Sequence, residues 1–145
     1  MSVEENKAIV RRFTNEVLNL ENKDLADEFI APDFVAYTPT NQYQGHAYTG
    51  KSFKEAMARF HSSYANLQYT IEDMIAEGDK VMVRATARGI HTGDFMTKFG
   101  KATATGKEIT YAIIFIYRLA DGKLVDLWEV YDNLARMQQL GVLPE

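Results

Sequence analysis

The first half of the chain repeats its apolar residues with the period of an amphipathic helix. Apolar positions recur three and four residues apart, and polar residues occupy the positions between them. Ser2 and Glu5 have the spacing of a capping box, which predicts that the first helix begins there, and Pro32 predicts the end of a short second helix. The sequence therefore predicts three N-terminal helices. Their apolar stripes are Ile9, Val10, Phe13, Val17 and Leu20 in the first, Leu25, Phe29 and Ile30 in the second, and Phe53, Met57, Phe60 and Tyr64 in the third.

The second half changes to a period of two, beginning near Leu67. This alternation predicts four strands, of which the third is apolar on both faces and therefore central in a sheet. A short extended segment is expected at 34–37, and Leu134, Met137 and Leu140 predict a last short helix. The four predicted strands cover residues 67–75, 81–89, 109–117 and 124–131.

Turn residues separate the predicted strands. Residues 77–80 and 120–123 both carry Gly and Asp, and the second segment is a strong hairpin signal. The stretches 93–106 and 38–50 are expected to be loops. Because helices are grouped early and strands late, we predict a single α+β domain over residues 1–145, with the helices packed on a curved, mainly antiparallel sheet. Such an arrangement forms a cone-shaped barrel, and its open end provides a pocket for a small apolar molecule.

Composition and charge exclude several classes of protein. The chain is 46% hydrophobic and 25% charged, with a net charge of −4, which is typical of a globular protein. No basic block lies beside interleaved aromatic residues, so we expect no nucleic-acid partner. The absence of cysteine excludes disulfides and thiolate sites. The N-terminus lacks the apolar core of a signal peptide, and the apolar stretch 111–117 is too short to span a bilayer, so we expect a cytoplasmic protein without a membrane partner.

Six segments of the chain, taken in order, carry a family resemblance. They are residues 4–13, 31–35, 75–81, 89–95, 121–125 and 138–141. Together they resemble the SnoaL-like polyketide cyclases of the nuclear-transport-factor-2-like superfamily, over almost the whole chain. The resemblance implies a cone-shaped α+β barrel that is usually a homodimer packed through its sheet, with no metal or organic cofactor. It does not specify a reaction, because this fold carries cyclases, isomerases, dehydratases, epoxide hydrolases and proteins without known activity.

The resemblance also implies a catalytic carboxylate. In the cyclases a carboxylate on the last strand acts as acid and base in an intramolecular aldol closure, and the matching position is Glu129, three residues before Asp132. The cyclases characteristically carry Asp there, so the longer Glu side chain would move the carboxyl group by about one methylene. Two further polar positions of the cyclase site match the apolar residues Ala36 and Phe115. The chain thus keeps the scaffold of the cyclases and loses part of their chemistry.

Strand alternation places two candidate catalytic residues, Glu129 and His91, on inward faces. Glu129 shares its face with Leu127 and Tyr131, and burial among such residues would raise its pKa towards neutrality. His91 continues the apolar face of Ala87 and would orient Glu129 or shuttle a proton. The alternatives are a solvated Glu129 at a sheet edge or dimer interface, and a His91 that only caps the end of a strand.

Apolar and aromatic side chains on the inward faces supply candidate walls for the pocket. Tyr37 and Tyr111 are also candidate hydrogen-bond donors to a substrate oxygen, although tyrosines commonly serve in packing alone. The three histidines have neither the spacing nor the acidic neighbours of a metal site. Residues 45–52 match a phosphate-binding loop pattern, but no apolar strand precedes them, so we reject nucleotide binding. The predicted ligand-binding residues are Phe13, Tyr37, Met57, Phe60, Tyr111 and Phe115.

Three functions fit this sequence. The first is a cofactor-free isomerase, lyase or cyclase that acts on a small hydrophobic carbonyl or polycyclic compound, with Glu129 as the base. The second is a non-catalytic protein that binds a small molecule in the same pocket, and the third is a dimerising scaffold. The inward carboxylate favours the first, whereas the lost polar positions favour the others. An outward apolar row of Ala112, Ile114 and Ile116 predicts a homodimer formed through the sheet.

Overall fold

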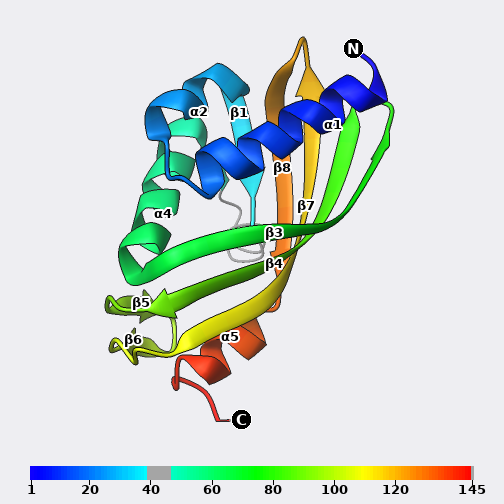
Figure 1. The fold of residues 1–145 in the computed structure, drawn as a ribbon. Coiled ribbons are helices and arrows are strands. Elements are labelled where there is room, and N and C mark those ends of the chain that lie inside the picture. The colour runs from blue at the N-terminus through cyan, green and yellow to red at the C-terminus, as the bar shows by residue number, and fades with distance from the viewer. Residues whose placement is uncertain (39–46, 145) are drawn as a thin grey trace.

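The computed structural model describes residues 1–38 and 47–144, and it shows helices packed against one curved sheet (Figure 1). The three predicted N-terminal helices and the last helix are all present. The Ser2 hydroxyl accepts a hydrogen bond from the Glu5 backbone N–H at 3.1 Å, which caps the first helix where the sequence predicts. The helical elements are α1 (Val3–Arg12), its π-helical continuation η1 (Phe13–Leu18), α2 (Lys23–Phe29), α4 (Gly50–Ser63) and α5 (Asn133–Gln139).

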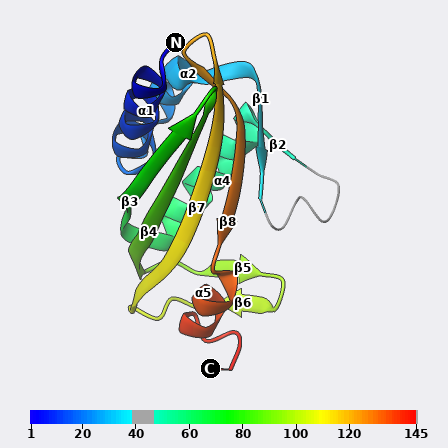
Figure 2. The same ribbon diagram turned by 90° about the vertical axis from the view of Figure 1, so that its right-hand side faces the viewer.

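The strands form one six-stranded sheet in the order β2-β1-β8-β7-β4-β3, and β5 with β6 forms a separate hairpin. β1 and β8 pair in parallel, whereas the other paired strands are antiparallel. The predicted α+β class with a mainly antiparallel sheet is therefore confirmed. The sheet curves strongly but does not close, since β2 and β3 are its edges (Figure 2). The strands are β1 (Ile30–Tyr37), β2 (Tyr48–Thr49), β3 (Tyr64–Glu77), β4 (Lys80–His91), β5 (Phe95–Thr97), β6 (Gly100–Ala102), β7 (Glu108–Ala120) and β8 (Lys123–Tyr131).

Three local expectations need correction. The predicted loop 93–106 contains the β5–β6 hairpin, whose three-residue strands are too short to show a period of two. Ile30 begins β1 instead of ending α2, and Tyr64 begins β3 instead of ending α4, because both residues have extended backbone conformations. Most of the predicted loop 38–50 lies outside the described residues.

The β7–β8 hairpin fixes the position of the last strand. Asp121 and Gly122 both have positive φ, 51° and 76°, as a two-residue hairpin turn requires, so the predicted turn is confirmed. One extra residue, Val125, then bulges from β8, because Leu119 pairs with Leu124 while Arg118 pairs with Asp126. The bulge shifts the register by one residue for the rest of β8.

The two faces of the sheet differ in exposure. α1 packs across β3 and β4, and α4 packs against β1 and β3 (Figure 1), so the inner face is buried. On the outer face Ile114 is 41% exposed and its cross-strand partner Val130 is 62% exposed. Within the described residues, no helix combines the length and apolarity needed to span a bilayer.

Candidate active site

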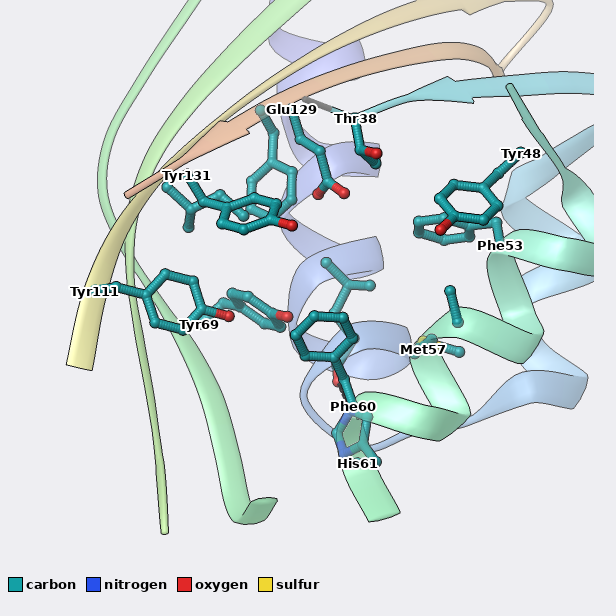
Figure 3. Close-up of a pocket in the computed structure, with 14 residues that line it drawn as sticks. Thr38, Tyr48, Phe53, Met57, Phe60, His61, Tyr69, Tyr111, Glu129 and Tyr131 are labelled. Atoms are coloured by element: carbon teal, nitrogen blue, oxygen red, sulfur yellow. Dashed lines mark hydrogen bonds between the residues drawn. The ribbon is translucent and has the colours of Figure 1, made fainter. Parts of the chain in front are cut away.

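A cavity of about 90 Å³ lies between the inner face of the sheet and α4 (Figure 3). Strands β3, β7 and β8 supply one wall, and helix α4 supplies the opposite wall. The walls are mainly apolar and aromatic, with one carboxylate among them. The lining residues are Leu18, Thr38, Tyr48, Phe53, Ala56, Met57, Phe60, His61, Tyr69, Tyr111, Ile113, Phe115, Glu129 and Tyr131.

Glu129 places its carboxylate in this cavity (Figure 3). It lies on β8 directly opposite Phe115 of β7, on the same face as the fully buried Leu127. No hydrogen bond or ion pair to its carboxylate occurs within the described residues. Glu129 is half-buried at the cavity wall and its carboxylate has no compensating partner among the described residues, so desolvation of the ionised form raises the Glu129 pKa to about 7. A carboxyl group with this pKa can both accept and return a proton at neutral pH.

Two tyrosine hydroxyls, from the strands on either side of β4, point into the same space (Figure 3). Tyr69 of β3 and Tyr111 of β7 both lie opposite Ala87 of β4, which brings the two rings to one level of the sheet. Burial, with a smaller contribution from the Glu129 charge, raises the pKa of both tyrosines well above the ordinary value. They therefore remain protonated at neutral pH, and the two hydroxyls are close enough that hydrogen bonding to Tyr111 partly offsets the rise in the Tyr69 pKa.

Nine of the fourteen lining residues were not predicted as site residues, and Tyr131, Tyr69 and His61 are three of them. Tyr131 lies two residues after Glu129 on the same face of β8, so strand alternation alone identifies it. Tyr69 was placed on a strand face, but only the pairing of β3 with β4 brings it beside Tyr111. His61 was considered only as a metal ligand, and its Nε2 lies 2.7 Å from the Leu18 carbonyl oxygen at the cavity wall.

The structure does not bring His91 to this cavity. His91 is fully buried at the end of β4, where its Nδ1 accepts a hydrogen bond from the Thr105 backbone N–H at 3.2 Å. Burial lowers its pKa, so the ring is neutral at neutral pH. Val83 marks the level of Glu129, because both pair with Phe115, and His91 lies eight residues further along β4. At roughly 3.3 Å per residue this is about 26 Å, so alternation gave the correct face of the sheet and the wrong height.

The six predicted wall residues divide into two groups. Met57, Phe60, Tyr111 and Phe115 line the cavity. Phe13 lies deeper, fully buried against Phe29 and Tyr117 with ring centroids 5.9 and 5.8 Å away. Tyr37 stacks on Trp128 at 5.7 Å, because Ala36 takes the inward position on β1. Within the described residues no group of three His, Cys, Asp or Glu side chains is arranged to hold a metal ion.

The chain matches a known family over most of its length. The family model for SnoaL-like polyketide cyclases matches residues 8–140. The chain belongs to this family. No curated protein sequence matches the chain significantly.

Solved structures of the family share the fold at low sequence identity. AclR from Streptomyces galilaeus, a proposed hydroxylase, has a TM-score of 0.85 and 24% identity, covering 99% of this chain and 85% of its own. TsrD from Streptomyces laurentii has a TM-score of 0.82 and 22% identity, with 99% of both chains covered. A proposed polyketide cyclase from Acidithiobacillus ferrooxidans has a TM-score of 0.82 and 25% identity, covering 97% of this chain and 98% of its own. These identities support the fold and leave the reaction open.

Proposed function

We propose that this SnoaL-like protein is a cofactor-free acid–base enzyme, an isomerase, lyase or cyclase that acts on a small hydrophobic carbonyl compound. The observation that carries this proposal is the Glu129 carboxylate, which lines a mainly apolar cavity and, within the described residues, accepts no hydrogen bond and forms no ion pair. A carboxylate in such surroundings is a stronger base than one in water. The position that matches Glu129 in the cyclases also carries a carboxylate.

The proposed chemistry is reversible removal of a proton from the carbon next to a carbonyl group. Glu129 takes the proton and becomes a neutral acid, and the electrons of the C–H bond move into the carbonyl group to form an enolate. The Tyr69 and Tyr111 hydroxyls are positioned to donate to the enolate oxygen, which stabilises the developing charge. Return of the proton by Glu129 to a different carbon completes an isomerisation. In an aldol closure the enolate carbon forms a bond to a second carbonyl carbon of the same molecule, the electrons of that C=O double bond move to its oxygen, and Glu129 gives the proton to this oxygen.

The second candidate function is non-catalytic binding of a small apolar molecule. It is favoured by two apolar wall positions, Ala36 and Phe115, where the cyclases carry polar residues, since Ala36 is fully buried and Phe115 lines the cavity. The pocket would serve both functions. They differ in whether Glu129 exchanges protons with the bound molecule.

Proton exchange on a model ketone separates the two functions. β-Tetralone has acidic C–H groups beside its carbonyl, and its uptake of deuterium from D2O can be followed by proton NMR. We expect the protein to accelerate the uptake, and Glu129→Gln to lower the protein-dependent rate by about 100-fold, a typical contribution of an acid–base group. Glu77→Gln, at an exposed end of β3, is the matched control and should keep the rate. Binding of β-tetralone without any acceleration would favour the binding protein.

We also propose that two copies associate through the outer face of the sheet. Ile114 and Val130 form an exposed apolar pair there, next to the half-buried pair Ile116 and Trp128. An exposed apolar patch of this kind on a sheet is typical of an association surface.

A further inference from the structure

A second hollow, which we call the vestibule, adjoins the cavity between α4, the β5–β6 hairpin and α5. It has a volume of about 390 Å³, and it shares Tyr48, Ala56, Phe60 and Tyr131 with the cavity. The same four residues therefore border both spaces. The vestibule is lined by Tyr48, Ala56, Arg59, Phe60, Phe95, Met96, Thr97, Lys98, Tyr131, Asn133, Arg136 and Met137.

Arg136 of α5 is the buried charge of the vestibule. Only 4% of the residue is exposed, yet its described hydrogen-bond partners are neutral. Its Nη1 donates to the Tyr64 hydroxyl at 3.1 Å, and its Nε donates to Asn133 Oδ1 at 3.3 Å. Within the described residues Arg136 forms no ion pair, and no hydrogen bond from its Nη2 occurs. Buried arginines are normally paired with an acid, so this guanidinium lacks the anion that its surroundings favour.

Aromatic rings fix the orientation of this guanidinium. Its carbon lies 5.2 Å from the ring centroid of Phe60, 5.0 Å from that of Phe95 and 5.9 Å from that of Tyr131. These contacts hold the planar group, and within the described residues Nη2 and the second N–H of Nη1 donate no hydrogen bond. Phe60 and Tyr131 also line the cavity, so Arg136 lies at the junction of the two spaces.

The charge of the vestibule is opposite to that of the whole chain. The chain has a net charge of −4, but the vestibule is lined by three cationic residues, Arg59, Lys98 and Arg136, and by no Asp or Glu among the described residues. Arg59 and Lys98 are exposed and would attract an anion from solution. Arg136 lies deeper and has the geometry to bind it.

We propose that the vestibule binds a carboxylate of the substrate, with the Arg136 guanidinium as the binding group. This inference rests on the proposed function, because it assigns the two ends of one substrate. The carboxylate accepts hydrogen bonds from Arg136, and the apolar body passes Phe60 and Tyr131 into the cavity, where the reacting carbon meets Glu129. The substrate class is therefore a hydrophobic keto acid whose carboxylate is remote from the reacting carbon. Arg is the preferred group for such planar, two-point recognition.

A matched pair of ligands tests this assignment by binding alone. Naphthoate and naphthamide have the same aromatic body and differ in the carboxylate, and isothermal titration calorimetry gives Kd for each. At about pH 6 naphthoate is ionised while most Glu129 side chains are neutral. We expect the wild-type protein to bind naphthoate about tenfold more tightly than naphthamide, as a charged hydrogen-bonded group contributes. Arg136→Met should abolish this preference and keep the affinity for naphthamide.

Control variants distinguish anion binding by Arg136 from anion binding by the exposed cations of the vestibule. Tyr64→Phe removes one partner of Arg136 and keeps its charge, so it should keep the preference for naphthoate. If Arg59→Gln with Lys98→Gln abolishes the preference while Arg136→Met keeps it, the exposed cations bind the anion and the proposal is wrong. If Arg136→Met does not fold, Arg136→Lys decides, because it keeps the charge and must still lose most of the preference. A wild-type protein that shows no preference also overturns the proposal.

The two proposals fail in different ways. Glu129→Gln should keep the preference for naphthoate, because it leaves the vestibule intact. A preference without any proton exchange on β-tetralone would refute the catalytic role of Glu129 and keep the carboxylate site. Proton exchange on β-tetralone without a preference for naphthoate would support the catalytic role of Glu129 and refute the carboxylate site.

Discussion

Replacing Glu129 by Gln should stabilise the protein above neutral pH. The side chain has an ordinary pKa of 4.5 and a pKa of about 7 in the folded state, because burial disfavours its charge. Folding thus favours the neutral form of Glu129. The stability that this preference contributes is fully present below about pH 4.5 and is lost as the pH rises to about 7. Gln has nearly the same shape and stays neutral at every pH. The two proteins should therefore be equally stable near pH 4 and differ at pH 8.

The size of this difference follows from the two pKa values. They differ by about 2.5, and each pKa unit corresponds to about 1.36 kcal/mol, so the variant should gain up to about 3 kcal/mol at pH 8. For a chain of this length that is an increase in Tm of roughly 10 °C. Urea denaturation of both proteins between about pH 5 and pH 8 measures the difference directly, and subtracting the two curves cancels every other titrating group. A difference that is independent of pH would refute the buried, unpaired state of Glu129.

Three further outcomes follow from the site and the sheet. The rate of β-tetralone exchange should rise with pH through about pH 7 and then level off, because the ionised Glu129 is the base; a rate without this midpoint would assign the proton transfer to another group. Tyr111→Phe should lower the exchange rate about tenfold or more, while an unchanged rate would exclude its hydroxyl from the site. Ile114→Glu should convert a dimer into a monomer in light scattering. The control Leu20→Glu, at a 70% exposed position on the helical side, should leave the dimer intact. A wild-type monomer at micromolar concentration would refute the association.

The elements of this fold could be predicted from the sequence because each is long or punctuated by strong signals. The change of period near Leu67 separates helices from strands, and Asp121 with Gly122 fixes one hairpin. The β5–β6 hairpin could not be predicted, since three residues carry no measurable period. The parallel contact of β1 with β8 also has no local signal, because the two strands are almost a hundred residues apart.

The site was harder to predict because it depends on register as well as on the face of each strand. Tight turns fix the register of β3 with β4 and of β7 with β8 only as far as the first bulge in each pair. β4 and β7 are joined by residues 92–107, which contain the separate hairpin, so no turn fixes their register. The prediction therefore gave the correct face of β4 for His91, but at its level on the strand His91 lies outside the cavity lining.

The bulge in β8 shows a second limit of turn-based reasoning. A two-residue turn after Ala120 without any bulge would place Trp128 opposite Phe115 and Glu129 opposite Ile114, on the outer face. The extra residue Val125 reverses this assignment. Alternation within β8 gave the correct face for Glu129 because it was counted from Leu127 and Tyr131. Both residues follow the bulge, so the shift in register does not affect them relative to Glu129.

The strand that carries Glu129 lies inside the sheet, between β1 and β7, and this has a consequence for how the family diversifies. A strand bonded on both sides cannot shift without breaking two ladders, so the position of the carboxylate is inherited with the fold. The facing wall comes from α4, where Ala56, Met57 and Phe60 contribute side chains and no strand pairing. Substitutions on that helix can reshape the cavity while Glu129 stays in place. Changes on a single helix can thus alter which molecule the cavity accommodates without moving its carboxylate.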